Sequence, residues 1–199
     1  MNKVEINRKG YNKIASKYNE ERNIYNNSKE LAYFLQLLPS NAKVLDVGCG
    51  AGVPVAQFLV ANGCNVIGID ISANMLELAK KQVPEAKFIE QDMIQSIFPN
   101  ESFDGIISLY AIFHVPKEEH LSIFQNFYRI LKKGGILHFC LSASANEGND
   151  YMYETELFWS SYSPEKSISL VKQAGFEILS DEILNRGNEE QCWVFAKKK

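Results

Sequence analysis

Three aspartates sit at or near the ends of apolar segments and could together bind a nucleoside. Asp70 ends one such segment, where its carboxylate could accept hydrogen bonds from both hydroxyls of a ribose. Asp92 follows the next segment and could accept from the exocyclic amine of adenine, or else cap a following turn. Asp46 lies near the end of the first segment, where its charge would repel a pyrophosphate and attract an amino group or a sulfonium. These residues favour a cationic nucleoside that carries an amino acid.

A glycine-rich turn follows Asp46 and could approach the same ligand. It contains Gly48, Gly50 and Gly52, and glycine permits both positive φ and van der Waals contact between the backbone and a ligand. The NAD-binding pattern is G-X-G-X-X-G/A, from which this chain departs with Val53 directly after the third glycine. Cys49 is expected to be a small residue fitted at the turn and not a reactive thiol, because no base lies near it in sequence.

His114 is the best candidate for a general base. It follows Ser108 and Tyr110, at the end of a predicted strand where ligands lie in doubly wound sheets. A histidine that only bonds to backbone is the alternative. His120 and His138 are weaker candidates for a general base, because they lie within a predicted helix and a predicted strand.

The elements that would position these residues form a repeated β–α pattern. Strands are predicted at 44–47, 65–70, 87–90, 103–110 and 136–141, and the glycine turn leads into a helix that starts at Pro54. Ser72 and Ser163 are predicted helix N-caps, and a helix is expected over 117–131. Segments 177–184 and 191–196 suggest a closing hairpin. The pattern predicts an α/β, doubly wound sheet with helices on both faces.

Two further segments could cover the site. Tyr11, Tyr18 and Tyr25 recur every seven residues, which is helical spacing, within a polar stretch that precedes a helix expected from Ser28 to Leu38. Residues 142–162 look irregular and rich in aromatic and acidic side chains, including Tyr153 and Trp159. Together with Tyr110, these two could line an acceptor pocket, because insertions at the carboxyl ends of strands often carry function.

The residues around the glycine turn resemble motif I of the class I S-adenosylmethionine (SAM)-dependent methyltransferases, in the group whose loop reads Asp-Val-Gly-Cys-Gly-Ala-Gly. The resemblance continues through segments 68–72, 91–93, 103–108 and 131–135 in the family's order, over about half of the chain. Within this family the chain is similar to the methyltransferases of ubiquinone and menaquinone biosynthesis. The resemblance implies a Rossmann-like sheet of seven strands, mostly parallel with an antiparallel last strand, SAM as cofactor and S-adenosylhomocysteine as product.

The resemblance also implies roles for individual residues. Residues 1–27 would form a helical lid, with Tyr18 over the cofactor, and residues 142–162 an insertion on the substrate side. Ile71, Met93 and Ser108 would border the cofactor, and Met75 could contact the purine or simply pack in the core. Transfer would be an in-line displacement onto an O, N, S or C atom of a small molecule, with a base needed only if the acceptor loses a proton.

Composition sets limits on other functions. The chain has 199 residues, four cysteines and a formal net charge of −3, which predicts one domain and gives no basic face for nucleic acid. The cysteines lack metal-ligand spacing, and there is no apolar run long enough for a membrane span, so we expect no metal site and a cytoplasmic monomer or homodimer with reduced thiols. A catalytically silent SAM-binding module and an NAD(P)-dependent oxidoreductase are the alternatives.

Overall fold

The structure is a computed structural model, which describes residues 2–21, 27–95, 97–186 and 189–199. Tyr25 therefore lies outside the described residues. The elements in chain order are α1 (Lys3–Glu21), α2 (Ser28–Gln36), β1 (Lys43–Val47), α3 (Val55–Ala61), β2 (Asn65–Asp70), α4 (Ala73–Gln82), β3 (Lys87–Glu90), η2 (Met93–Gln95), β4 (Phe103–Ser108), η3 (Ile112–His114), η4 (Lys117–Glu119), α5 (His120–Ile130), β5 (Leu131–Ser142), β6 (Asn146–Met152), β7 (Thr155–Ser161), α6 (Pro164–Gln173), β8 (Phe176–Arg186) and β9 (Glu189–Lys198).

Seven strands form one sheet in the order β3-β2-β1-β4-β5-β9-β8. The neighbours from β3 to β5 pair in parallel, and β9 pairs antiparallel with both β5 and β8. The strand order reverses between β1 and β4, so the carboxyl ends of these two strands border a crevice where ligands bind in such sheets. The predicted α/β architecture, with its antiparallel last strand, is confirmed.

Helices cover both faces of this sheet. Side chains of consecutive strand residues point to opposite faces, and His138 and Phe139 are consecutive in β5. The His138 ring packs against Phe34 of α2 with centroids 6.0 Å apart, whereas Phe139 packs against Phe124 of α5 at 5.1 Å. The central strands are therefore buried on two sides, which explains why they are nearly continuous in apolar residues.

The structure confirms most predicted element positions and shifts several ends. Ser72 and Ser163 accept hydrogen bonds as helix caps, but α2 has Asn27 at its N-cap position and Ser28 as its first residue. Strand β4 ends at Ser108 and not at Tyr110, because Tyr110 has a φ of +58° and leaves the extended conformation. Strand β5 starts already at Leu131, before the two glycines predicted to precede it.

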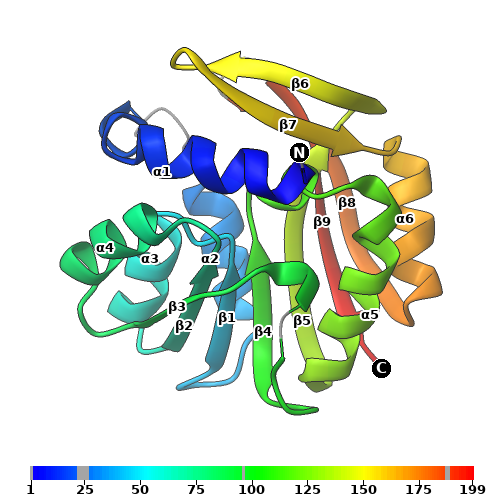
Figure 1. Ribbon diagram of the computed structural model, residues 1–199. Helices are drawn as coiled ribbons and strands as arrows, with labels where there is room; N and C mark the ends of the chain where they lie inside the picture. Colours follow the sequence, from blue (N-terminus) through cyan, green and yellow to red (C-terminus); the bar gives the residue numbers. More distant parts are fainter. Residues whose placement is uncertain (1, 22–26, 96, 187–188) are drawn as a thin grey trace.

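The prediction that residues 142–161 are irregular is wrong. Most of this segment forms an antiparallel hairpin of β6 and β7, paired from Asn146 opposite Ser161 to Met152 opposite Thr155. The sequence pattern did not predict the hairpin, because β6 is exposed along most of its length and so lacks alternation of apolar and polar residues. In Figure 1 the hairpin and helix α1 both lie across the carboxyl-terminal edge of the sheet, above the ends of β1 and β4.

Candidate functional site

The glycine turn after β1 is held against the neighbouring strand by its backbone. The N–H groups of Gly48 and Cys49 both donate to the Ile69 carbonyl, at 2.8 and 3.0 Å. Gly48, Gly50 and Gly52 all have positive φ, between 52° and 79°. A Cβ at Gly48 would lie 2.2 Å from the Ala111 Cβ, whereas a Cβ at Gly50 would meet nothing within 4 Å. Of these three glycines, only Gly50 faces open space.

Asp70, at the end of β2, is fixed by the turn that it faces. Its Oδ2 accepts from the Gly50 N–H at 2.9 Å, and its Oδ1 accepts from the Ser72 N–H at 2.8 Å. Each carboxylate oxygen can accept more than one hydrogen bond, so both retain the capacity to bind ligand hydroxyls. The carboxylate is thus oriented before any ligand arrives.

Asp92 lies beside this point because β2 and β3 run in parallel. Asp70 is in register with Glu90, and Asp92 follows two residues later. The Asp92 Oδ1 accepts from the Ile94 N–H at 2.9 Å, so it does cap the short helix η2, as the alternative interpretation held. Its side chain also borders the same cavity as Asp70, so capping and ligand binding are compatible.

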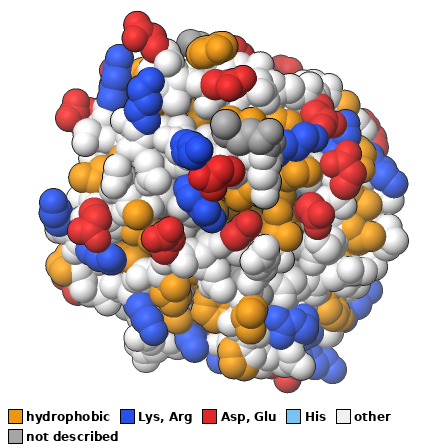
Figure 2. Space-filling model, viewed as in Figure 1, with side chains coloured by type: hydrophobic (Ala, Val, Ile, Leu, Met, Phe, Trp, Pro, Cys, Tyr) orange, Lys and Arg blue, Asp and Glu red, His pale blue; other side chains and the backbone are white. Residues whose placement is uncertain are grey.

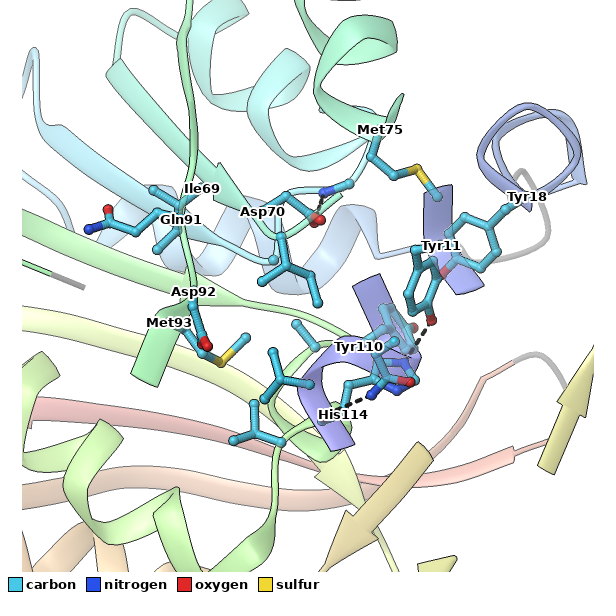
Figure 3. Close-up of a pocket in the computed structure, with 17 residues that line it drawn as sticks. Tyr11, Tyr18, Ile69, Asp70, Met75, Gln91, Asp92, Met93, Tyr110 and His114 are labelled. Carbon is cyan, nitrogen blue, oxygen red and sulfur yellow. Dashed lines mark hydrogen bonds between the residues drawn. The ribbon is translucent and has the colours of Figure 1, made fainter. Parts of the chain in front are cut away.

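A cavity lies between these carboxylates and α1, with about 650 Å³ of empty space when its opening to solvent is included. Figure 3 shows Asp70, Met75, Asp92 and His114 around it, with Tyr11 and Tyr18 reaching over it from α1. Its wall consists of Val4, Asn7, Tyr11, Tyr18, Gly48, Gly50, Ile69, Asp70, Ile71, Met75, Gln91, Asp92, Met93, Tyr110, Ala111, His114 and Val115.

His114 is buried at the end of this cavity, and both of its ring nitrogens have partners. Nδ1 lies 3.0 Å from the Phe158 carbonyl oxygen, and Nε2 lies 2.7 Å from the Tyr11 hydroxyl. Burial lowers the pKa of His114 from 6.5 to about 4, although the bond to Phe158 works in the opposite direction. The imidazole is therefore neutral at physiological pH.

Tyr110 carries backbone strain where the strand order reverses. A φ of +58° is uncommon for a bulky residue and costs on the order of 1–3 kcal/mol. The conformation is held by the Tyr110 N–H, which lies 3.1 Å from the Cys140 Sγ, and by the Tyr110 hydroxyl, which donates to the Asn27 Oδ1 at 3.1 Å. Such strain is common at functional sites, and Tyr110 lines the cavity.

Helix α1 is docked on both sides of the cavity. On the hairpin side, the buried Asn7 amide donates to the carbonyls of His114 and Phe158 and accepts from the Phe158 N–H. On the other side, the Asn12 Oδ1 accepts from the Ser72 hydroxyl at 2.8 Å, at the start of α4. The helix therefore bridges two parts of the fold across the cavity.

The structure brings most of the predicted site residues together. The cavity is lined by ten of them, namely Gly48, Gly50, Asp70, Ile71, Met75, Asp92, Met93, Tyr18, Tyr110 and His114. Met75 is also almost fully buried, so it packs in the core and borders the cavity at once.

Other predicted residues lie elsewhere. Asp46 is buried in the sheet, and Cys49 is a buried thiol whose pKa is raised by burial and by the nearby charges of Asp46 and Asp70. Gly52 packs against Phe88. The Ser108 hydroxyl donates to the Val47 carbonyl at 3.0 Å and so joins β4 to β1.

Two of the three aromatic residues predicted to bind the acceptor, Tyr153 and Trp159, also lie outside this cavity. Tyr153, with a φ of +50°, is at the hairpin turn, where Lys17 of α1 lies over its ring. Trp159 packs on the rings of Phe113 and His114 and borders a separate cleft of about 1240 Å³ beside the hairpin. The Phe113, His114 and Trp159 rings therefore lie between the two hollows.

Several wall residues were not predicted as site residues. The sequence pattern did not indicate that Asn7 is buried at the site, because a polar side chain in a polar segment is expected to be exposed to solvent. Tyr11 was weighed only as a lid residue, and its contact with His114 joins residues that are far apart in the chain.

Comparison with known proteins agrees with this geometry. Residues 44–135 match a protein family described as a methyltransferase domain. The chain is 32% identical to a sterol 24-C-methyltransferase of Pneumocystis carinii over 76% of this chain and 44% of that protein. It is 31% identical to an uncharacterized methyltransferase of Oceanobacillus iheyensis over 72% of this chain and 61% of that protein. The chain thus spans less than two thirds of either relative.

Solved structures show the same fold. A SAM-dependent methyltransferase of Methanosarcina mazei superposes with a TM-score of 0.74 at 20% identity, over 83% of this chain and 96% of that one. The glycine turn and the acidic end of β2 both lie within the matched residues 44–135. Over residues 44–135 the chain matches the methyltransferase-domain family, and its fold is that of the class I SAM-dependent methyltransferases.

Proposed function

We propose that this protein transfers the methyl group of SAM to a small-molecule acceptor. The observation that carries the proposal is the Asp70 carboxylate, held by the N–H groups of Gly50 and Ser72 at the wall of the cavity. In the proposed complex Asp70 accepts from the ribose hydroxyls, and Gly50 lets the ligand approach the turn because nothing occupies the space beside its Cα.

The remaining wall residues fit the rest of the cofactor. Asp92 would accept from the adenine amine, and the Met93 N–H would donate to a ring nitrogen. Ile71 and Met75 supply apolar surface for the purine, and Tyr18 covers the opening from α1. Asp46 lies behind the turn, where its charge favours a cationic ligand at longer range.

Bound SAM supplies an activated methyl group on a sulfonium. The protein's own contribution is to align the acceptor with that methyl group and to exclude water, and positioning of this kind can lower a barrier by about 7–11 kcal/mol in favourable cases. His114, which is neutral and at the cavity wall, is the proposed proton acceptor when the acceptor must lose a proton.

The proposal extends to the acceptor and the setting of the enzyme. The name of the sterol 24-C-methyltransferases states that they methylate a carbon atom of a sterol. This chain spans less than half of the Pneumocystis protein, so we propose only a small organic acceptor. Tyr110 would contact it from the cavity, and Trp159 and Tyr153 would border its route of entry beside the hairpin. No helix in the described part of the chain has the length and hydropathy of a membrane span. We propose a single-domain cytoplasmic monomer or homodimer.

Nucleic acid is not the proposed acceptor. Figure 2 shows acidic and basic side chains interspersed on the face that it displays, over a chain with a net charge of −3. Tight binding to a phosphate backbone depends on clustered positive charge.

Two measurements test the proposal. Calorimetry should show that S-adenosylhomocysteine binds with micromolar or tighter affinity while NAD does not bind, and SAM labelled in its methyl group should transfer label to a compound in a small-molecule cell extract. Binding of NAD in place of S-adenosylhomocysteine would indicate the oxidoreductase. Binding of S-adenosylhomocysteine with no transfer of label to any extract would indicate the silent SAM-binding module.

A further inference from the structure

The hydrogen bonds of His114 determine where its proton lies. A carbonyl oxygen can only accept, so the Nδ1 that faces the Phe158 oxygen at 3.0 Å must carry the hydrogen. Because the ring is neutral, Nε2 holds a lone pair. The Tyr11 hydroxyl, 2.7 Å away, must therefore donate to Nε2. Nε2 of His114 therefore accepts from the Tyr11 hydroxyl at the cavity wall, and the dashed line in Figure 3 marks this hydrogen bond.

This arrangement gives the Tyr11 oxygen a defined polarity. Its hydrogen is directed to His114, so the oxygen can serve a ligand only as an acceptor. The ring is fixed edge-on against both Tyr18 and His114, with centroids 5.5 and 5.1 Å apart. The carbonyl of His114 is itself bound by the Asn7 amide at 2.7 Å, which joins the backbone of η3 to the same helix that carries Tyr11.

We propose that Tyr11 is the catalytic residue that contacts the acceptor nucleophile, that His114 acts through it, and that the acceptor carries its nucleophile as an O–H or N–H group. This inference rests on the proposed function and narrows its substrate class. A nucleophile without hydrogen, such as a thioether or a tertiary amine, could make no hydrogen bond to the Tyr11 oxygen.

The proposed step balances in atoms and charge. The nucleophilic atom bonds to the methyl carbon, the carbon–sulfur bond breaks, and its electron pair stays on sulfur. The hydrogen of the nucleophile passes to the Tyr11 oxygen while the Tyr11 hydrogen passes to the His114 Nε2. The positive charge of the sulfonium thus disappears as an imidazolium charge forms, so the net charge of the site is unchanged and the transfer adds no ion beside the buried His114 ring.

The charged groups near Tyr11 and His114 lie in the cavity wall and on the side of the hairpin. Asp70 and Asp92 line the same cavity. On the hairpin side, Lys3 lies 4.6 Å from the centre of the Phe158 ring and, together with Lys117, pairs with Glu147, whose pKa these contacts lower to about 2. Glu147 is therefore already ionised and neutralised by two lysines, and it does not titrate near neutral pH.

The test compares Tyr11→Phe with wild type, because phenylalanine preserves the ring contacts and removes only the oxygen. Initial rates are measured with methyl-labelled SAM and the small-molecule cell extract as acceptor, from pH 6 to 9, with S-adenosylhomocysteine affinity measured in parallel. Tyr33→Phe is the matched control, since Tyr33 is partly exposed and packs on Phe195, away from the cavity. We expect Tyr11→Phe to lower the rate about 100-fold or more at pH 7, as is usual for loss of a proton-transfer group.

The pH dependence separates chemistry from packing. In Tyr11→Phe the acceptor must lose its proton to solvent, so the rate should rise by about tenfold per pH unit and approach the wild-type rate. A loss of the same fold at every pH, or no loss, would overturn the inference while leaving methyl transfer established. A labelled product methylated on carbon, or on an atom that bore no hydrogen, would also overturn it. If wild type neither binds S-adenosylhomocysteine nor transfers label, the proposed function itself fails.

Discussion

Substitution of Gly50 by alanine should separate cofactor binding from folding. Gly50 has a φ of +52°, and a left-handed conformation costs an L-residue roughly 1–2 kcal/mol. A Cβ at this position would meet no protein atom within 4 Å, so that backbone cost is the whole expected loss of stability. For a chain of this size it corresponds to a fall in Tm of about 2–8 °C.

The effect on the cofactor should be separate from this cost. The Gly50 N–H already donates to Asp70, so the proposed ribose site lies directly beside the added methyl group. Overpacking of a well-fitted site by one methyl group costs about 1–3 kcal/mol, which weakens the affinity for S-adenosylhomocysteine roughly 5- to 150-fold.

Gly63 provides a matched control for the strain. It has a φ of +81°, and a Cβ there would meet only the Asn41 Oδ1, at 4.0 Å. Gly63→Ala should therefore lower Tm by a similar amount and leave calorimetric affinity for S-adenosylhomocysteine unchanged. Wild-type affinity in Gly50→Ala, or equal losses of affinity in both variants, would refute the placement of the ligand beside this turn.

Three further predictions follow from the packing and charge of the site. Asp70→Asn should weaken S-adenosylhomocysteine binding about 100-fold by calorimetry, since hydrogen bonds to a charged group contribute about 1.5–3 kcal/mol each. Asp104→Asn should leave the affinity unchanged, because Asp104 lies at the amino-terminal end of β4, away from the cavity, and pairs with Lys132. Gly10→Ala should raise the helix propensity of α1 but detach this helix from the hairpin, because the new Cβ would overlap the Leu157 side chain. Faster proteolysis of α1 with an unchanged Tm would support this expectation, and an unchanged cleavage rate would contradict it. The free energy of unfolding should also fall as the pH drops from 6.5 towards 4, because burial lowers the pKa values of His114, His120 and His138 from 6.5 to about 4 and the unfolded chain therefore binds protons first. With three such groups the free energy of unfolding should change by at most about 4 kcal/mol per pH unit. Urea unfolding between pH 7 and 4.5 that shows no such loss would be inconsistent with three neutral histidines.

The positions of the residues proposed to bind the cofactor followed from local sequence. Gly50 and Asp70 lie at the ends of consecutive parallel strands, and in such a sheet the carboxyl ends of neighbouring strands meet at one edge. The same rule placed Asp92 beside them. An apolar strand, a glycine turn and a terminal carboxylate are each encoded within a few residues, so a single sequence was sufficient to predict that Gly50, Asp70 and Asp92 lie around one cavity.

The acceptor half depended on contacts between distant segments. Tyr11 and His114 are 103 residues apart, and their hydrogen bond forms only because α1 docks on the hairpin through Asn7. The hairpin itself escaped prediction, because an exposed strand needs no apolar alternation to pair with its neighbour. Local patterns therefore determined where a nucleoside could bind. Only the tertiary structure decided which tyrosine meets which histidine, since that depends on how a polar helix packs over the sheet and not on any spacing along the chain.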